Sequence, residues 1–327
     1  MINRVRVIVV CWNNRDVLPR CLDHLLRTDW PAALDVVVVD NGSTDGSADD
    51  WERRHPDVRL IQTGRNLGFA GGVNAGLHDL DDVDAVALVN SDAFVDHGWL
   101  RPLAAALDGD PSLGAAAPKL LFAQLGPDGV PAINNVGNEL GRRWEPHDRG
   151  YGEPDRGQYD RPEEVWGWCG AAVLLRRRYL DEVGHLDERL FMYCEDVDLS
   201  WRGRRAGWRY RYGPASVVHH QHRASSGGER TPLLDVLNRR NRLVVVSRHG
   251  GWRGRVVAWS RALGGIVVGV GTDLLRPLAS GRRPDLAPLR RRVRAVVDAA
   301  RLLAGGRPPL PEGLASGARP GGAVAGP

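Results

Sequence analysis

Residues 36–43 read Val36-Val37-Val38-Val39-Asp40-Asn41-Gly42-Ser43: four β-branched residues are followed at once by four polar or glycine residues. A β-branched run favours a buried strand, and Asp, Asn, Gly and Ser together favour a turn at its end. A second short apolar run covers residues 5–10, and residues 17–26 between the two runs carry apolar side chains at helical spacing. A strand, a helix and a strand in this order predict a β–α–β unit with two parallel strands.

The same alternation continues along the chain. The expected elements are a helix after Ser47, strands at 58–61, 85–89 and 170–176, a Gly/Ala-rich helix at 70–77 and a helix at 195–205. Residues 124–164 are rich in Gly, Pro, Asn and Asp and lack periodicity, so we expect an extended loop region there. The fold class is therefore α/β, with a mostly parallel, Rossmann-like sheet flanked by helices on both faces.

The charge of the chain is divided unevenly. Residues 251–327 hold thirteen Arg against four acidic residues, whereas the whole chain has a formal net charge of +4, so residues 1–250 are acidic overall. The basic part is expected to form helices at 253–278 and 286–303, the second with one apolar side made of Leu286, Leu289, Val293, Val296, Ala300 and Leu303. We predict a catalytic domain over 1–250, a helical basic extension over 251–304 and a disordered tail over 305–327.

A basic amphipathic helix of this kind either lies on an anionic lipid surface or packs on its own domain with a solvated arginine face, and both interpretations stay open here. The apolar stretch 262–270 is too short and too glycine-broken to span a bilayer, which needs about 20 helical residues. The four cysteines have no C-x-x-C spacing, and no secretory signal is recognisable at the start. We therefore expect reduced thiols in a cytoplasmic protein.

Polar residues follow three of the expected strands, at the edge where ligands bind in doubly wound folds. They are Asn13 and Asn14, then Asp40, Asn41 and Ser43, then Asn90, Ser91 and Asp92. Asp40 can accept hydrogen bonds from a base or ribose, and Asp92 suits a hard divalent cation that bridges phosphate oxygens. Each motif alone is equally typical of a turn or a helix cap.

Two further motifs could contact phosphate. Residues 64–72 place Arg65 and several glycines before a helix, where backbone N–H groups and the guanidinium can meet a pyrophosphate. A glycine-rich turn for close packing is the other interpretation, because this is not the Rossmann fingerprint. Residues 219–222, in an expected polar loop over 219–228, supply His side chains that could complete a metal shell with Asp92.

The densest chemical signal is Glu195-Asp196-Val197-Asp198, where three carboxylates open a helix after an aromatic stretch. The helix dipole is expected to lower their pKa and to keep ionised a carboxylate that takes a proton from an acceptor hydroxyl. Trp166 and Trp168 lie ahead of this motif in the chain. They could stack on a sugar ring or could be core aromatics.

Taken together, these motifs resemble family 2 glycosyltransferases of the GT-A fold, in particular the bacterial rhamnosyltransferase-like branch. The resemblance covers about residues 5–246 and rests on seven motifs in order: Val39–Ser47, Asn66–Asn74, Asn90-Ser91-Asp92, Gly170 before a strand, Glu195–Leu199, His220 before Ser225–Gly228, and Arg240-Asn241-Arg242. Where the family's usual metal motif has an acid at its first position, this chain has Asn90.

The resemblance implies a role for each matching position. Asp196 is implied as catalytic base with Glu195 beside it, and Asp92 with His220 as ligands of Mg²⁺ or Mn²⁺ on the diphosphate. The implied nucleotide-sugar contacts are Asn13, Asp40, Asn41, Ser43, Arg65, Asn66, Gly71, Asn74, Asn90 and Ser91. The implied acceptor contacts are Trp166, Trp168 and Asp198.

The implied reaction is an inverting sugar transfer from a nucleotide-sugar to a hydroxyl of a saccharide or polyprenyl-diphosphate-linked saccharide, in cell-wall or surface polysaccharide synthesis. L-rhamnose from dTDP-L-rhamnose is the leading donor, with UDP- and GDP-sugars as alternatives. The basic extension then suits peripheral contact with the inner face of the plasma membrane, and no nucleic-acid partner is expected.

Two other classes of function are weighed against this one. A sugar-phosphate nucleotidyltransferase also pairs an α/β sheet with acidic metal ligands, but no glycine-rich phosphate loop containing Arg or Lys lies near the amino terminus. A non-catalytic nucleotide- or nucleic-acid-binding protein is disfavoured because the acidic part would repel a polyanion and the basic part has no interleaved aromatic platform.

Overall fold

The computed structural model describes residues 1–306 except 50, 127 and 222–231. Its strands are β1 Arg4–Cys11, β2 Ala33–Asp40, β3 Arg59–Gln62, β4 Ala85–Val89, β5 Ala93–Val95, β6 Leu113–Leu125, β7 Pro131–Asn135, β8 Asn138–Leu140, β9 Pro146–Asp148, β10 Glu163–Val165, β11 Ala172–Arg176 and β12 Arg209–His220. Its helices are α1 Leu18–Leu26, α2 Trp51–Arg54, α3 Gly68–Gly76, α4 Leu100–Gly109, α5 Arg177–Val183, η1 Glu188–Leu190, α6 Glu195–Arg205, α7 Pro232–His249, α8 Gly251–Gly269, η2 Val270–Leu275, α9 Arg276–Ala279 and α10 Ala287–Leu303.

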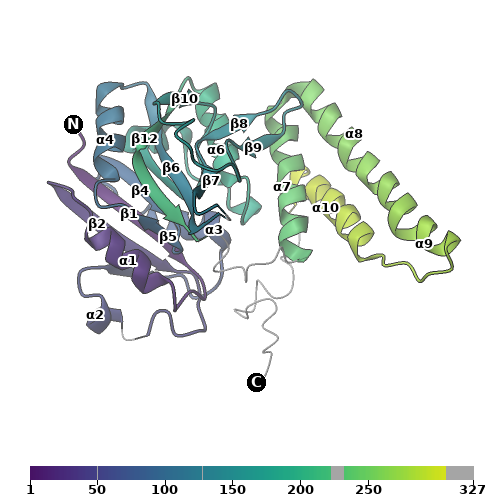
Figure 1. Ribbon diagram of the computed structural model, residues 1–327, viewed down its shortest axis with the longest axis horizontal. Helices are drawn as coiled ribbons and strands as arrows, with labels where there is room; N and C mark the ends of the chain where they lie inside the picture. Colours follow the sequence, from purple (N-terminus) through teal and green to yellow (C-terminus); the bar gives the residue numbers. More distant parts are fainter. Residues whose placement is uncertain (50, 127, 222–231, 307–327) are drawn as a thin grey trace.

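The central sheet has the strand order β10-β12-β6-β11-β4-β1-β2-β3 (Figure 1). The pairs β4–β1, β1–β2 and β2–β3 are parallel, as the first β–α–β unit predicts. Strand β11 runs antiparallel to both of its neighbours, β4 and β6, and joins this parallel half to β6 and β12, which are again parallel to each other. The expectation of a mostly parallel sheet with helices on both faces is thus confirmed.

The strands supply side chains alternately to two cores, one on each face of the sheet. On β1, Val5, Val7 and Val9 face the core that α1 and α4 cover, and Ile8 faces the core under α3, α5 and α6. This arrangement fixes the ends of β1, β2 and β4 at one edge of the sheet, where the polar residues that follow them come together.

Three long elements are not predicted from the sequence: β6, β12 and α7. Strand β6 begins with Leu113-Gly114-Ala115-Ala116-Ala117, residue types that disfavour strands, and burial between β11 and β12 decides its conformation instead. The prediction that 124–164 is a loop region is wrong, because β7, β8, β9 and β10 lie within it. His219 and His220 end β12 rather than lying in a polar loop, and residues 222–228 lie outside the described residues.

The basic extension forms two antiparallel helical segments that project from the sheet domain (Figure 1), here called the C-terminal arm (251–303). Its second helix, α10, packs against α7 and α8. The buried side of α10 consists of Ala295, Asp298, Ala299 and Leu302, whereas Val293 and Leu303 of the predicted apolar side are exposed. The predicted disordered tail, from 307 on, lies outside the described residues.

The first helix of the arm is longer than expected. Through a π-helical turn, α8, η2 and α9 join into one helix, Gly251–Ala279, and within the described residues it is the one helix long and apolar enough to cross a membrane. The expectation that this apolar segment is too short to span is therefore wrong. Only 6% of its most apolar window is buried, so it is not a core helix. Length and composition alone do not distinguish a spanning helix from one that lies on a surface.

We predict that the arm shares its core with the sheet domain. Ala299 and Leu302 of α10 belong to the same apolar cluster as Val197 and Trp201 of α6. Leu302→Ala should therefore lower the free energy of unfolding by about 2–4 kcal/mol, measured by urea denaturation. The matched control is Leu303→Ala, whose side chain is exposed and should cost under about 0.5 kcal/mol. Equal, small effects would show that the arm folds apart from the domain.

Candidate functional site

The polar residues after β1 and β2 form one hydrogen-bonded group at the sheet edge. Asn13, in a left-handed conformation, accepts a hydrogen bond from the Thr44 N–H at 2.8 Å, and its own N–H donates to Ser43 Oγ at 3.0 Å. Asp40 Oδ1 accepts from the Ser43 N–H at 3.0 Å. All three predicted contacts therefore lie together, and buried Asp40 is a carboxylate at the end of a strand, as recognition of a ribose or base requires.

The turn before α3 is tied to the same group through buried Asn41. Its Nδ2 donates to Asn66 Oδ1 at 3.1 Å and to the Gly68 carbonyl at 2.9 Å. Asn66 Nδ2 is buried without a partner among the described residues, so a ligand atom is needed to satisfy this donor. Arg65 is exposed beside this turn. The geometry thus offers one unpaired amide and one exposed cation near a helix start, both suited to an anion.

Two of the predicted nucleotide-sugar contacts have other tasks. Asn74 spends both ends of its amide on the segment before η1, donating to the Leu186 carbonyl at 3.0 Å and accepting from the Leu186 N–H at 3.2 Å. A side chain at Gly71 would meet Leu67 Cβ at 2.6 Å, so this glycine serves packing within the first turn of α3. The amide of Asn74 is therefore already used within the protein, and contact of Gly71 with the nucleotide-sugar stays a prediction.

Asp92 and His220 meet although 128 residues separate them. His220 Nε2 lies 3.1 Å from Asp92 Oδ1, and Nδ1 lies 3.0 Å from Asn134 Oδ1. If the Asn134 oxygen is the acceptor, the imidazole carries its proton on Nδ1. The acceptor atoms His220 Nε2 and Asp92 Oδ1 then face each other at 3.1 Å. Such a pair is stable when a proton or a cation lies against both atoms.

The surroundings of this pair limit what it can hold. Asn90 Nδ2 approaches His220 Nε2 at a longer 3.3 Å, and Ser91 Oγ accepts from Asn14 Nδ2 at 2.9 Å. In the part of the chain that the structure describes, no three His, Cys, Asp or Glu side chains gather as a metal site. The donor set therefore fits a divalent cation only if oxygens of a bound diphosphate or water complete its shell.

Asp196 opens α6 and is held by backbone donors. Its Oδ2 accepts from the Gly170 N–H at 3.0 Å, and its Oδ1 accepts from its neighbour, the Val197 N–H, at 2.7 Å. The side chain is half-buried, whereas Glu195 beside it is only 6% exposed and has one oxygen without a partner in the described structure. Asp196 is thus the carboxylate of the pair that a solvent-borne acceptor can reach.

The expectation that the helix dipole lowers these pKa values is wrong for Glu195 and Asp196, because burial outweighs it. The pKa of Asp198 is lowered, because the hydrogen bond from His249 and the charge of Arg202 outweigh the effect of burial. Burial raises the pKa of Asp196 to about 6, against the two backbone N–H groups, which lower it. Burial and the neighbouring negative charge of Asp196 raise the pKa of Glu195 well above its usual value. A carboxylate with the pKa of Asp196 is ionised at neutral pH and well matched to act there as a proton acceptor.

The predicted acceptor contacts are not confirmed. Trp168 is fully buried in the core between the sheet and α6, so neither ring face can stack on a sugar. Asp198 is only 3% exposed and accepts from Arg202 Nε at 2.9 Å and His249 Nε2 at 2.8 Å, which makes it a link between α6 and α7. Trp166 is half-buried and packs edge-on against Trp201 at 5.2 Å.

A further carboxylate near Asp196, not predicted from the sequence, is Asp148 on the β8–β9 hairpin. It remains open to solvent and accepts from Asn135 Nδ2 at 2.7 Å, and its charge contributes to the raised pKa of Asp196. The residue before Asn135, Asn134, is the extra residue of a β-bulge on β7, since Leu120 and Leu121 pair with Asn135 and Ile133. The bulge lets Asn134 reach His220 while Asn135 reaches Asp148. A bulge in a segment without periodicity leaves no signal in the sequence.

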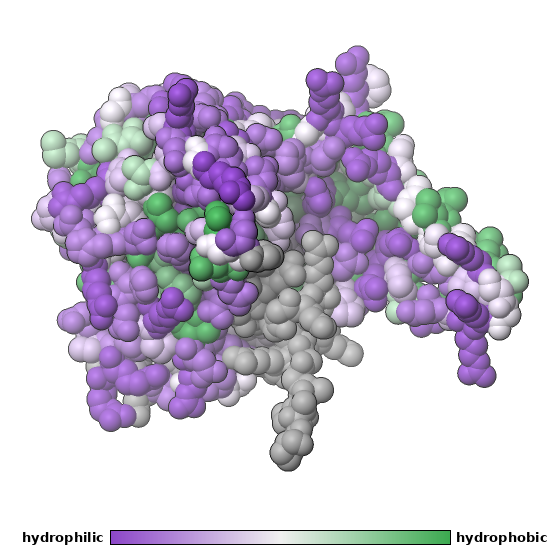
Figure 2. Space-filling model, viewed as in Figure 1, coloured by the Kyte–Doolittle hydropathy of each residue, from purple (hydrophilic) through white to green (hydrophobic). Residues whose placement is uncertain are grey.

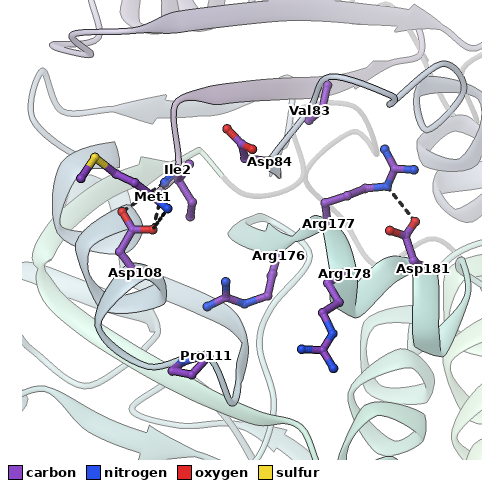
Figure 3. Close-up of a pocket in the computed structure, with 10 residues that line it drawn as sticks. All are labelled: Met1, Ile2, Val83, Asp84, Asp108, Pro111, Arg176, Arg177, Arg178 and Asp181. Carbon is purple, nitrogen blue, oxygen red and sulfur yellow. Dashed lines mark hydrogen bonds and ion pairs between the residues drawn. The ribbon is translucent and has the colours of Figure 1, made fainter.

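A separate pocket lies at the opposite edge of the sheet, beside the starts of β1 and β4 (Figure 3). Its charged groups are already paired: Arg176 donates to the carbonyls of Leu113 and Asp110, and Asp84 accepts from the Arg4 N–H. These contacts satisfy backbone groups at the ends of helices and strands, so we do not assign the functional site to this pocket.

The chain is similar in sequence to known glycosyltransferases. Residues 3–244 match the family described as glycosyltransferase like family 2. The N-acetylglucosaminyl-diphospho-decaprenol L-rhamnosyltransferase of Mycobacterium tuberculosis is 32% identical over 278 residues, which cover 78% of this chain and 88% of that protein. The pre-mycofactocin glycosyltransferase of the same species is 29% identical, over 83% of this chain and 54% of its own length.

Solved structures share the fold at low sequence identity. GalNAc-T7 with UDP, GalNAc and Mn²⁺ matches with a TM-score of 0.61 at 14% identity, over 93% of this chain and 57% of that one. The mannosyltransferase PcManGT from Pyrobaculum calidifontis, in complex with GDP-Man and Mn²⁺, matches with a TM-score of 0.55 at 15% identity, over 92% and 88%. The predicted α/β fold class is thereby confirmed.

We predict that activity depends on the ionised form of Asp196. Because the pKa of Asp196 is raised to about 6, kcat should be level near pH 7.5 and fall about tenfold per unit below pH about 6, as the carboxylate takes up a proton. Initial rates between pH 4.5 and 8 measure this fall of kcat, the acid limb of the pH profile. Asp148→Asn removes a negative charge and should move the limb to lower pH.

The matched control for this profile is Glu195→Gln, which keeps the shape of the side chain without its charge and should leave the acid side of the profile in place, whereas Asp196→Asn should abolish turnover. Full loss in Glu195→Gln together with residual activity in Asp196→Asn would reverse the assignment of the base.

Proposed function

The chain belongs to the glycosyltransferase-like family 2, and from this premise we propose that it is an inverting, divalent-metal-dependent transferase of GT-A fold. Its donor is a nucleoside-diphosphate sugar, bound where β1, β2 and β4 end. Its acceptor is a hydroxyl of a polyprenyl-diphosphate-linked saccharide, with Asp196 as base. The observation that carries the proposal is Asp196, half-buried, held by two backbone N–H groups and raised in pKa to about 6.

The proposed reaction is a single displacement. Asp196 takes the proton from the acceptor hydroxyl as its oxygen attacks the anomeric carbon, the bond to the diphosphate breaks, and the configuration at that carbon inverts. The Gly170 and Val197 N–H groups orient the carboxylate, and burial of Glu195 raises its pKa and so favours the uncharged form beside the attacking oxygen. The unpaired Asn66 amide and exposed Arg65 are placed to bind the departing anion.

Asp92 and His220 are the proposed metal ligands, as a carboxylate and an imidazole acceptor 3.1 Å apart. When bound, Mg²⁺ or Mn²⁺ supplies positive charge to the leaving diphosphate. Support comes from the two solved neighbours that contain Mn²⁺ together with UDP or GDP-Man. The carboxamide of Asn134 fixes the imidazole from behind, in the way that outer hydrogen bonds orient metal-binding histidines.

L-rhamnose is the proposed sugar, and synthesis of a cell-wall or surface polysaccharide the proposed process. The support is the similarity to the mycobacterial L-rhamnosyltransferase that acts on N-acetylglucosaminyl-diphospho-decaprenol, at 32% identity over most of both chains. The acceptor proposed here is accordingly a saccharide on a polyprenyl diphosphate, delivered at the cytoplasmic face of a membrane.

We predict that the purified protein releases a nucleoside diphosphate from dTDP-L-rhamnose when Mn²⁺ or Mg²⁺ and a polyprenyl-diphosphate saccharide are present. Asp92→Asn should lower kcat/KM for the donor by at least about 100-fold, since it removes the charged metal ligand. A coupled diphosphate assay with dTDP-, UDP- and GDP-sugars measures this. Release of pyrophosphate in place of a nucleoside diphosphate would identify a nucleotidyltransferase instead.

Peripheral membrane contact is proposed for the C-terminal arm. Val256, Leu263 and Val267 follow one another at helical spacing on α8 and are 56%, 50% and 71% exposed. Figure 2 shows apolar side chains gathered on this arm, next to hydrophilic ones. On α10 the exposed Val293 and Val297, with half-buried Leu289 beside them, are bordered by arginines, namely Arg290, Arg294 and Arg301. Apolar stripes bordered by cations suit the surface of an anionic bilayer.

Lying on the surface is favoured over spanning because α8–α9 is tied to the arginine-rich α10. Arg292 of α10 donates to Asp273 of η2 at 2.6 Å. A spanning α8–α9 would draw this ion pair and the neighbouring arginines into hydrocarbon, at a cost of about 2.5–3.5 kcal/mol for each charged residue at the helix centre.

We predict binding to vesicles that contain phosphatidylglycerol, weakened by salt because arginines contribute to it. Val267→Asp combined with Val268→Asp should reduce the bound fraction at least about tenfold in a sedimentation assay. The control is Leu125→Asp, a 66% exposed apolar residue on β6 of the sheet domain. Equal binding of both variants would remove the arm from the membrane contact.

A further inference from the structure

The backbone directly before the base is strained. Phe191, Tyr193 and Cys194 have φ of 67°, 74° and 65°, a region that residues with a side chain rarely occupy. Three of the six non-glycine residues with positive φ in the described chain thus fall within one turn, 191–194. This turn leads straight into Glu195 and Asp196, so its conformation decides where α6 begins and where the two carboxylates lie. Strained backbone persists only where its surroundings hold it in place.

A single amide on α7 holds this turn from one side. Asn241 is fully buried, and its Nδ2 lies 2.8 Å from each of three carbonyl oxygens, those of Leu190, Met192 and Tyr193. Its Oδ1 accepts from Arg240 Nε at 2.8 Å. Because the guanidinium can only donate, this bond fixes the amide with its nitrogen toward the turn. Arg240 also donates to the Leu190 carbonyl at 2.8 Å.

The donor side of the site holds the same turn from the other side. The Phe191 carbonyl accepts from the Ala70 N–H at 3.2 Å, in the first turn of α3. A Cβ at Gly68 would lie 2.3 Å from this carbonyl oxygen, so glycine is required for the approach. The Gly68 carbonyl in turn accepts from Asn41. The turn is therefore clamped between the donor-site residues and Asn241.

We infer that Asn241 is a positioning residue for the transfer reaction, which sets the orientation of Asp196 by fixing the strained turn 191–194 between α7 and the start of α3. The inference rests on the proposed function, since it takes Asp196 as the base. Asn241 itself touches no reacting atom. Its effect is expected on the rate of the chemical step and not on donor affinity, because the donor contacts lie beyond the turn.

Packing of α7 does not require the amide. Leu237 contacts Trp12 and Phe191 in one apolar cluster, and Leu243 and Val244 lie in another with Val197. Small substitutions at 241 should therefore leave the fold intact while they release the turn. Loss of three hydrogen bonds allows the strained residues to relax toward ordinary backbone conformations, and this relaxation would rotate the first turn of α6.

The test compares Asn241→Ala and Asn241→Ser with wild type and with Arg239→Ala, a control on the exposed side of the same helix. We expect kcat to fall at least tenfold in Asn241→Ala and less in Asn241→Ser, which keeps one donor. The KM for the donor, and the dissociation constant for the nucleoside diphosphate measured by calorimetry, should stay within threefold. Circular dichroism and the thermal midpoint monitor the fold.

A second readout does not depend on turnover. Titration of the Asp196 carboxyl group by ¹³C NMR should show its pKa shifted in Asn241→Ala and unshifted in Arg239→Ala. Unchanged kcat and an unchanged Asp196 titration in a folded Asn241→Ala protein would overturn the inference, as would a loss of donor affinity equal to the loss of kcat. If wild type releases no nucleoside diphosphate, the proposed function fails, and the titration alone still decides whether Asn241 positions Asp196.

Discussion

The competition between burial and backbone hydrogen bonding at Asp196 is the interaction on which the site depends. Burial alone would protonate this carboxyl group and remove the base, whereas the Gly170 and Val197 N–H groups favour its charged form. The balance leaves a pKa of about 6, so the group is ionised at neutral pH yet still a useful proton acceptor. Gly170 lies two residues before the start of β11, so the position of that strand in the sheet also affects the pKa of Asp196.

The antiparallel strand β11 joins the two halves of the site. It pairs with β4, whose end leads to Asn90, Ser91 and Asp92, and it follows Gly170, which binds Asp196. Asp92 and Asp196 are therefore placed by two neighbouring strands of one sheet, and His220 is placed by β12, which lies beyond β6. Hydrogen-bonded neighbouring strands keep a fixed spacing. The distance between the proposed sites for the leaving group and for the base is therefore set by the sheet rather than by a loop.

The elements that carry their own periodicity could be predicted from the sequence. The β-branched runs at β1 and β2, the apolar spacing of α1 and the acids that open α6 all lie where expected, because local pattern and tertiary packing agree there. The pairing of Asp92 with His220 followed from the resemblance. Strand β6 could not be predicted, since its alanines and glycine form a strand only between two neighbours. The predicted acceptor contacts of Trp168 and Asp198 are not confirmed, because the sequence gives residue type but not exposure, and both side chains are buried. Asp148 could not be predicted for the same reason.

Helix α7 connects two parts of the chain that were predicted as separate units, the catalytic domain and the basic extension. One of its sides carries Arg240 and Asn241 to the strained turn, and another side receives α10. Burial lowers the pKa of Arg240 to about 10, while the negative charge of Asp298 on α10 opposes this shift and helps to keep the guanidinium charged. The arm proposed to touch the membrane therefore also supports the residue that orients the Asn241 amide. Helix α7 thus packs the arm and the turn before Asp196 into one body.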